Sequence, residues 1–290
     1  MSTQVEQGVI DEMRMKAIQS FGRDALKNGG ITHVWIGSKF YALSVDVVDI
    51  EVILKRSLEK DNLTRFARNL IGNGLIFAPV SIWKPRRKIH APIFSPANLN
   101  KFAKVFTEQS ESMVKQVKST FGDGAEPLWK YMPTYTFHSI CETVLGLKLV
   151  LNGTKEKQLM ESFNVTFKLV TARMAEPWLQ LDALYKLLPY QRTFEKNKEI
   201  LRRFVNEIIK EKRKQIKDNI KIDTGDTKSI KSFLELHIVS SGVDGRFSDE
   251  ELLEESLVML LATDNTTVGL CFTICLLAQY PDVQEKVFQE

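Results

Sequence analysis

Leu257–Ala278 reads LVMLLATDNTTVGLCFTICLLA, and this stretch decides the fold. It is apolar on every side of a helix except at one polar block in its middle, TDNTT at 263–267. A helix that is hydrophobic all round is buried in protein or in lipid, and polar groups are costly to bury unless they have partners or a function. The stretch therefore predicts a long core helix that carries a reactive site.

A transmembrane helix is the alternative interpretation of this stretch. Its length would just suffice, but Asp264 at the middle of a bilayer would cost about 2.5–3.5 kcal/mol, and Asn265 lies beside it. We therefore favour burial in a protein core. Ser248 and Glu251 have the spacing of a capping box at the start of the helix, and Pro281 ends it.

The composition is that of an ordinary globular protein. Of the 290 residues, 43% are hydrophobic and 26% are charged, and the net charge of +4 is too small to indicate nucleic-acid binding. The three cysteines have neither a disulfide framework nor a metal-binding spacing. We expect Cys271 and Cys275 to be buried as small apolar side chains. Residues 1–20 lack the apolar core of a signal peptide, and no membrane anchor is visible.

Most of the remaining chain is predicted to be helical, with a small β portion near its start. His33–Ile36 and Phe40–Ser44 are rich in β-branched and aromatic residues, and Gly37-Ser38 would join them as a hairpin. Lys217–Lys231 is polar and predicts a surface loop. The spacing of apolar residues predicts further helices over Asn98–Thr120, Tyr135–Leu147, Glu161–Met174 and Phe194–Ile216. The expected fold class is mainly α.

A second constellation lies in Ile82–His90, IWKPRRKIH. If Pro85 occupies the first turn of a helix, as proline can, Trp83 and Arg87 lie close enough to bind one anionic ligand. An indole N–H and a guanidinium are both donors suited to carboxylates. The alternative is that the Arg/Lys cluster is simply solvated, and His90 alone is more often a hydrogen-bonded surface or boundary residue than a ligand.

Within the polar block of the long helix, Ala262 and Thr266 share one face at a spacing of four residues. The small side chain of Ala262 lets a flat ligand approach the backbone, and the Thr266 hydroxyl can donate a hydrogen bond to such a ligand. Asp264 and Asn265 point elsewhere, because each residue of a helix is rotated by about 100° from the one before.

Together and in this order, the two constellations resemble the cytochrome P450 family, especially the microsomal enzymes of insects. Trp83–Arg87 matches the family's W-x-x-x-R signature, and Ala262–Thr267 aligns with its pattern [AG]-G-x-[DE]-T-[TS]. Asp244–Glu251 resembles the segment that leads into the family's long I helix, and Tyr280–Val287 resembles the start of the J helix. The resemblance covers nearly the whole chain.

The resemblance implies a cytochrome P450-like fold over residues 1–290 as a single partial domain, from the first β hairpin to the start of the J helix. We expect this fold to be incomplete at both ends. The family's N-terminal anchor is not found, and neither is its F-x-x-G-x-x-x-C-x-G loop, so no axial cysteine is assigned and no metal ligand is expected in this chain. Glu199–Arg202 fits the family's E-x-x-R spacing but precedes the long helix, which indicates a chance match.

The resemblance also assigns roles to individual residues. Trp83 and Arg87 would contact the propionates of a haem, Ala262 and Thr263 would border the haem, and Thr266 would help deliver protons to iron-bound oxygen. The family has a glycine where this chain has Thr263, whose side chain would crowd the groove in which oxygen binds.

Two further catalytic candidates and three substrate candidates complete the expected site. Asn265 takes the place of the family's acid and cannot ionise, whereas Asp264 supplies a carboxylate one residue earlier, on another face than that of Thr266. The substrate-facing candidates, for which ordinary core packing is the alternative, are Ile76, Phe77 and Trp178.

The function implied by the resemblance is that of a haem-thiolate monooxygenase, which inserts one oxygen atom of O₂ into a hydrophobic small molecule. Its electrons would come from NADPH through NADPH-cytochrome P450 reductase, at the cytosolic face of the endoplasmic reticulum membrane. The alternative is a catalytically inactive chain, either a truncated remnant or an incomplete gene model. In that case the long helix would expose a large apolar surface.

Overall fold

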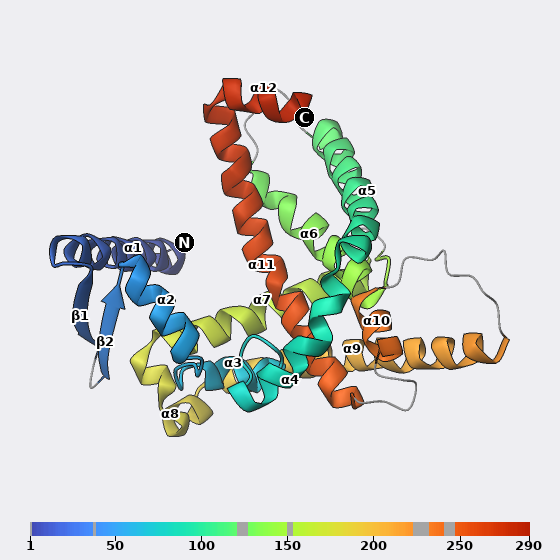
Figure 1. The fold of residues 1–290 in the computed structure, drawn as a ribbon, viewed down its shortest axis with the longest axis horizontal. Coiled ribbons are helices and arrows are strands. Elements are labelled where there is room, and N and C mark those ends of the chain that lie inside the picture. Colours follow the sequence, from blue (N-terminus) through green and yellow to red (C-terminus); the bar gives the residue numbers. More distant parts are fainter. Residues whose placement is uncertain (1, 37–38, 121–126, 150–152, 223–231, 241–246) are drawn as a thin grey trace. The chain divides into compact units, whose positions relative to one another are not determined.

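The computed structural model describes residues 2–36, 39–120, 127–149, 153–222, 232–240 and 247–290 (Figure 1). The chain divides into two compact units, Met1–Asp61 and Asn62–Glu290. Each unit is considered by itself. Whether the two form the single domain expected from the sequence stays a prediction.

The first unit contains a helix, a β hairpin and a second helix. Its elements are α1 (Ser2–Lys27), β1 (Ile31–Ile36), β2 (Lys39–Ser44) and α2 (Val47–Arg56). The strands pair antiparallel, with Ile31 opposite Ser44 and Ile36 opposite Lys39. The predicted hairpin is therefore confirmed, while its expected turn at Gly37-Ser38 lies outside the described residues.

The described part of the second unit is helical. Its elements are α3 (Thr64–Ile71), α4 (Val80–His90), η1 (Ala91–Phe94), α5 (Pro96–Thr120), η2 (Leu128–Lys130), α6 (Met132–Ile140), η3 (Cys141–Leu145), α7 (Thr154–Ala175), η4 (Pro177–Gln180), α8 (Asp182–Leu187), α9 (Pro189–Ile222), α10 (Phe233–Ser240), α11 (Asp249–Gln279) and α12 (Pro281–Gln289). Together with the hairpin of the first unit, these helices confirm the expected fold class, mainly α with a small β portion.

Helix bounds differ from the prediction mainly at α9. This helix continues to Ile222, so the surface loop expected over Lys217–Lys231 is wrong for its first six residues. The described part of α9 is amphipathic, with Leu201, Val205 and Ile209 almost fully buried. Residues 223–231 lie outside the described part of the chain.

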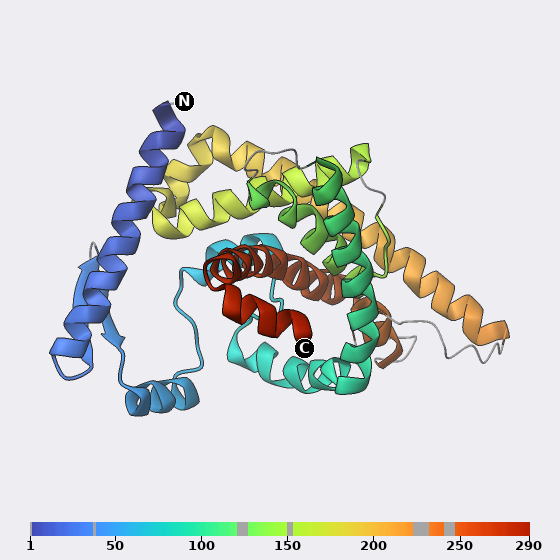
Figure 2. The same cartoon turned by 90° about the horizontal axis from the view of Figure 1, so that it is seen from above.

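The long helix α11 runs through the middle of the second unit, with α3, α6 and α9 packed against it (Figures 1 and 2). Ser248 begins the helix as predicted: its hydroxyl accepts from the amide of Glu251, and the Glu251 carboxylate accepts from the Ser248 amide. The core of the unit forms around the first half of α11, where Leu252, Leu253 and Leu260 are at most 1% exposed.

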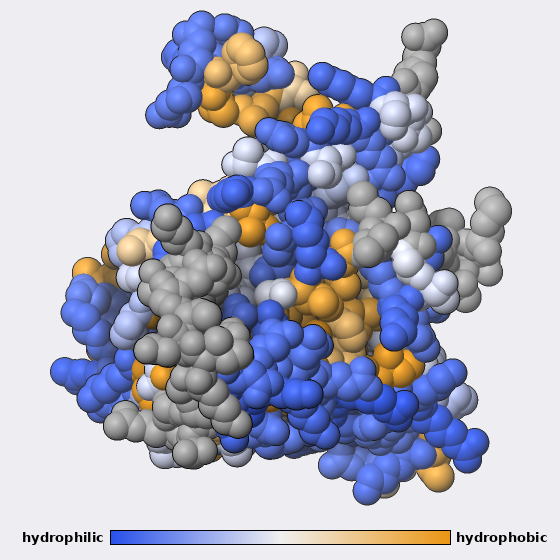
Figure 3. All heavy atoms as spheres, turned by 90° about the vertical axis from the view of Figure 1, so that its right-hand side faces the viewer, coloured by the Kyte–Doolittle hydropathy of each residue, from blue (hydrophilic) through white to orange (hydrophobic). Residues whose placement is uncertain are grey.

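Burial of α11 stops near Thr267. Beyond this residue Phe272 is 67% exposed and Leu276 is 54% exposed, so the expectation that the apolar stretch is buried throughout is wrong for its second half. Cys275 is exposed as well, which also corrects the expectation of a buried thiol there. In Figure 3 apolar atoms lie open to solvent at the top, the height at which Figure 1 shows α12 and the end of α11.

The length and composition of α11 would allow it to cross a membrane. Among the described residues, one helix meets this criterion, and it is α11. Core helices of soluble proteins meet the criterion too. Here the first half of α11 contributes to a protein core, whereas its second half leaves an apolar face uncovered by the described residues.

Candidate functional site

Helix α4 brings Trp83 and Arg87 together. The Arg87 guanidinium carbon lies 5.8 Å from the centroid of the Trp83 ring, one helical turn away. Their proximity was predicted, but the reason given for it was wrong, because Pro85 lies in the interior of α4 and not in its first turn. A proline there removes one backbone hydrogen bond, so contacts to other helices must help to keep α4 helical.

Those contacts come from Arg86, which sequence reasoning did not single out. Unlike its exposed neighbour Arg87, it is only 8% exposed and points toward the first turns of α11. Its Nη1 lies 3.1 Å from Glu254 Oε2 and 3.0 Å from Glu255 Oε1, and its Nη2 lies 3.0 Å from Glu251 Oε1. Arg86 thus belongs to a cluster with three glutamates, whereas Lys84, Arg87 and Lys88 of the same segment are exposed, as the solvated alternative expects.

The same carboxylates hold the loop between α3 and α4. Glu254 Oε1 accepts a hydrogen bond from the Asn73 amide at 2.8 Å, and Glu255 Oε2 accepts one from the Leu75 amide at 3.1 Å. Gly72 permits this approach, because its φ is +59° and a Cβ there would lie 2.1 Å from Glu254 Oε1. The loop is therefore tied to α11 by backbone donors.

Electrostatics within this cluster favour its charged form. Burial would by itself lower the pKa of Arg86, but hydrogen bonds to Glu251 and Glu254 outweigh it and raise the pKa above the ordinary value. Burial would likewise raise the pKa of Glu251, but hydrogen bonds from Ser248 and Arg86 bring it below the usual range. The Arg86–Glu251 ion pair thus remains charged at neutral pH.

Two histidines extend the cluster toward α10. His237 Nε2 and His90 Nδ1 lie 2.9 Å apart, and both rings are almost fully buried. His90 Nε2 is 3.5 Å from Glu255 Oε2, and Phe247 packs edge-on against His237 at 5.0 Å. Burial, followed by the charges of His90 and Arg86, lowers the pKa of His237 to about 3.

The depressed pKa of His237 predicts acid sensitivity. The unfolded chain takes up this proton below about pH 6.5, whereas the folded chain resists it down to about pH 3. The stabilisation is therefore complete above pH 6.5 and is lost as the pH falls, by roughly 1 kcal/mol per pH unit. Urea unfolding between pH 7 and pH 5 measures this slope.

His237→Gln, which cannot titrate, should flatten this dependence by about one proton, whereas His33→Gln on the exposed face of β1 should leave it as in the wild type. An unchanged slope in His237→Gln would contradict the assignment.

A pocket of about 290 Å³ lies beside the middle of α11. Ala262 and Asn265 reach it from α11, and Ile76 and Phe77 reach it from the loop that Glu254 and Glu255 hold. Sequence reasoning missed the wall from α7, although its residues recur at the spacing of one helix face; these are Phe167, Val170, Thr171 and Met174.

Thr266 lies one turn beyond Ala262 and is exposed. Its hydroxyl donates to the Ala262 carbonyl oxygen at 3.1 Å, so within the helix it has a partner. Thr263 and Asp264 point elsewhere, toward a small cavity of about 20 Å³ that Phe137 of α6 also lines. The expected separation of Asp264 from the Thr266 face is therefore confirmed, and burial raises the pKa of the Asp264 carboxyl.

Other residues singled out in the sequence lie away from this pocket. Trp178 is on η4, 61% exposed, and is not among the residues that line the pocket. Cys141 is fully buried, and burial raises the pKa of its thiol well above the ordinary value, so it is held neutral. Arg202 pairs with Glu250 at 2.6 Å on the surface, which agrees with a chance E-x-x-R match.

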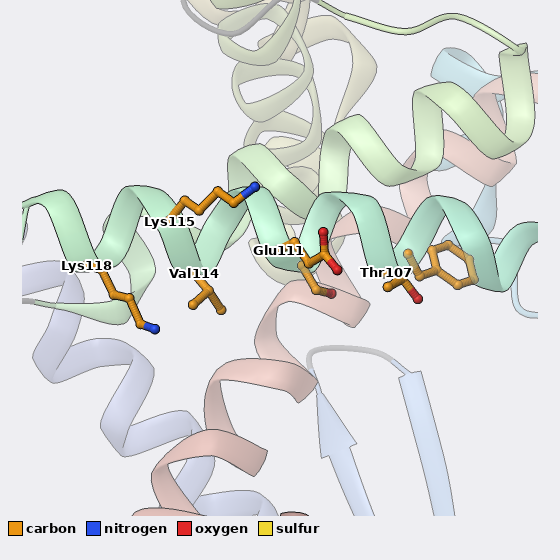
Figure 4. A pocket seen from close by; sticks show the side chains of 7 residues that line it. Thr107, Glu111, Val114, Lys115 and Lys118 are labelled. Carbon is orange, nitrogen blue, oxygen red and sulfur yellow. The ribbon is translucent and has the colours of Figure 1, made fainter.

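A second hollow runs along α5 (Figure 4). Its volume is about 560 Å³, but all of its lining residues come from α5, among them Glu111, Val114 and Lys115. Side chains from one helix do not converge on a ligand as those of the pocket beside α11 do. The pocket between α3, α7 and α11 is therefore the better candidate site.

A family model described as Cytochrome P450 matches residues 9–290. The chain belongs to the cytochrome P450 family. It is similar to "Cytochrome P450 4c21" of Blattella germanica (27% identity over 83% of this chain) and to "Cytochrome P450 4d2" of Drosophila melanogaster (27% over 91%). It is also similar to "Cytochrome P450 4V2" of Mus musculus (28% over 90%). The chain covers 50%, 55% and 51% of these three proteins, so it spans about half the length of the curated relatives it matches.

A solved cytochrome P450 of zebrafish, determined with progesterone, has the same fold over most of this chain. The TM-score is 0.70 with 16% sequence identity, over 93% of this chain and 62% of the zebrafish chain. The cytochrome P450 fold expected from the sequence is thereby confirmed.

Proposed function

We propose that this chain supplies the oxygen-side wall and the propionate-binding helix of a haem monooxygenase of the cytochrome P450 family. The observation that carries the proposal is the contrast between two adjacent arginines on α4. Arg86 forms ion pairs with the carboxylates of α11. Arg87, in contrast, is exposed beside Trp83 and has no ion pair among the described residues. An anionic ligand would complete the Trp83–Arg87 pair.

The residues present fit a haem. Indole N–H and guanidinium groups are the donors that two propionates require. On α11 a Cβ added to Gly269 would meet no atom within 4 Å, and the neighbouring Leu270 and Phe272 are exposed. A flat apolar macrocycle can approach such a helix face closely. When bound by a cysteine thiolate, haem would supply the activation of O₂.

The axial ligand is not assigned to any of the three cysteines. Cys141 is buried and neutral, and Cys271 and Cys275 lie on α11 itself, outside any F-x-x-G-x-x-x-C-x-G sequence. For the 290-residue polypeptide by itself we therefore propose that no monooxygenase turnover occurs. Haemin-loaded, reduced protein exposed to carbon monoxide should lack the Soret band of a thiolate-ligated haem, and its presence would refute this.

Residues of α11 would handle the proton and the substrate. Thr266 would hold a proton at Oγ1 by exchanging its bond to the Ala262 carbonyl for a bond to a ligand. Asn265 would orient water in the pocket but cannot supply a proton. The Asp264 carboxyl could take part in proton transfer only from the other face of the helix. Ala262 would border the haem, whereas Thr263, which the resemblance also placed there, is buried toward Phe137 of α6 and would not.

The substrate would be a hydrophobic small molecule. Ile76 and Phe77 would contact it in the pocket beside Asn265, and Trp178 would contact it only where the substrate extends to the surface. Family membership supports a redox partner, for which we propose NADPH-cytochrome P450 reductase at the cytosolic face of the endoplasmic reticulum membrane. Association with that membrane belongs to the same proposal.

The propionate site can be tested by fluorescence. In a variant that retains Trp83 alone, with Trp35, Trp129 and Trp178 replaced by phenylalanine, haemin should quench the emission saturably. Haemin dimethyl ester, whose propionates are blocked, should bind about 10- to 100-fold more weakly, because a hydrogen bond to a charged group contributes about 1.5–3 kcal/mol.

Arg87→Met in this background should weaken haemin binding and reduce the difference between the two ligands to the part that the Trp83 N–H contributes. Arg202→Met, which removes a surface arginine of another helix, should change neither affinity. Equal binding of haemin and its ester by the unsubstituted parent would count against the proposed function.

A further inference from the structure

The guanidinium group of Arg86, on α4, contacts two other segments of the chain. Arg86 Nη1 donates to the Asn73 carbonyl oxygen at 2.8 Å as well as to Glu254 and Glu255, and Nη2 donates to Glu251. Asn73 precedes the pocket residues by only a few positions. Arg86 therefore touches the loop before the pocket, the first turns of α11 and, through its own backbone, α4.

Each of these segments carries a different part of the site. The loop leads to Ile76 and Phe77, which line the pocket, and α4 presents Trp83 and Arg87. The loop and α4 are anchored to the same two carboxylates, because Glu254 and Glu255 accept hydrogen bonds both from the loop amides and from the Arg86 guanidinium. A shift of Arg86 would therefore move the substrate wall and the propionate donors together.

We propose that Arg86 is a positioning residue that couples the substrate wall at 76–77 to the propionate-binding face of α4 through the carboxylates of α11. This inference rests on the proposed function of Trp83 and Arg87. Arg86 itself touches neither ligand. It acts by fixing the direction of α4, whose interior proline weakens its own hydrogen bonding.

The planar fork of arginine is needed for this coupling. Its two terminal nitrogens bind different glutamates at fixed angles, which the single ammonium of lysine cannot reproduce. Arg86→Lys keeps the charge and so protects the fold, while it removes the geometry. Arg86→Met removes both.

Amide hydrogen exchange of the full chain tests the coupling without ligand. Arg86→Met should speed exchange of the Asn73 and Leu75 amides at least about tenfold, and Arg86→Lys should do so to a smaller extent. The matched control is Arg202→Met, which also removes an arginine paired with the first turn of α11, and it should leave these amides unchanged. Equal acceleration throughout α7 and α9 would overturn the proposal, as would wild-type exchange in both Arg86 variants.

Haemin provides the second readout. In the wild type, saturating haemin should slow exchange at Leu75, although Leu75 does not belong to α4. In Arg86→Lys this slowing should disappear even when haemin is bound at saturation to the Trp83–Arg87 site. Persistence of the slowing in Arg86→Lys would overturn the proposal.

The two proposals fail separately. If haemin does not bind the wild type, the proposed function fails. The ligand-free exchange then decides by itself whether Arg86 holds the loop and α4 together.

Discussion

Replacing Arg86 by methionine should lower the free energy of unfolding by about 3–5 kcal/mol, because removal of one partner leaves buried charges uncompensated. Glu255 has a side chain that is only 2% exposed, and that of Glu254 is 10% exposed. Neither carboxylate can recover its hydration without opening the junction between α4 and α11. Urea unfolding followed by circular dichroism at pH 7 measures the loss.

The matched control for this prediction is Arg202→Met. Its partner Glu250 has a side chain that is 57% exposed, and exposed ion pairs contribute about 0–1 kcal/mol. Combining Arg86→Met with Glu254→Gln and Glu255→Gln should restore part of the lost stability, since it removes the unpaired charges as well. A loss below about 1 kcal/mol in Arg86→Met would mean that water reaches the cluster.

Gly74→Ala is expected to destabilise the protein by about 1–3 kcal/mol through overpacking. A Cβ at Gly74 would lie 2.2 Å from Val258 Cγ2 and 2.7 Å from the Glu254 carbonyl oxygen. The second contact is with backbone of a buried helix, which cannot rotate away. The substitution should therefore push the loop off α11, and thermal or urea unfolding would record the change.

Gly269→Ala serves as the opposite control for the glycine substitution. Gly269 is inside α11, and a Cβ there would have nothing within 4 Å. Alanine in a helix interior is favoured over glycine by roughly 0.5–1 kcal/mol, so this variant should be slightly more stable than the wild type. If both alanine variants changed stability in the same direction, the close approach of the loop to α11 would be wrong.

Local sequence signals predicted much of the fold. The capping box at Ser248 and Glu251, the proline at 281 and the apolar run between them were enough to place α11. The two strands followed from their β-branched and aromatic residues. Such features depend on neighbours within a few positions, which the sequence displays directly.

The environment of the site could not be predicted in the same way. Arg86 sits in a run of basic residues that suggests solvation, and its glutamate partners lie 165 to 169 positions away. The exposure of Phe272 was not predicted either. The hydrophobicity of a side chain indicates that burial is favourable, but it does not show which helix, if any, covers it.

The distance along the chain between Asn73 and Glu254 has a consequence for biosynthesis. These residues are 181 positions apart, and at 5–20 residues per second a ribosome needs on the order of ten to forty seconds to make the intervening chain. During that interval the Asn73 loop and Arg86 of the nascent chain lack the glutamates of α11 and form hydrogen bonds with water. This junction can therefore close only when the beginning of α11 has left the exit tunnel.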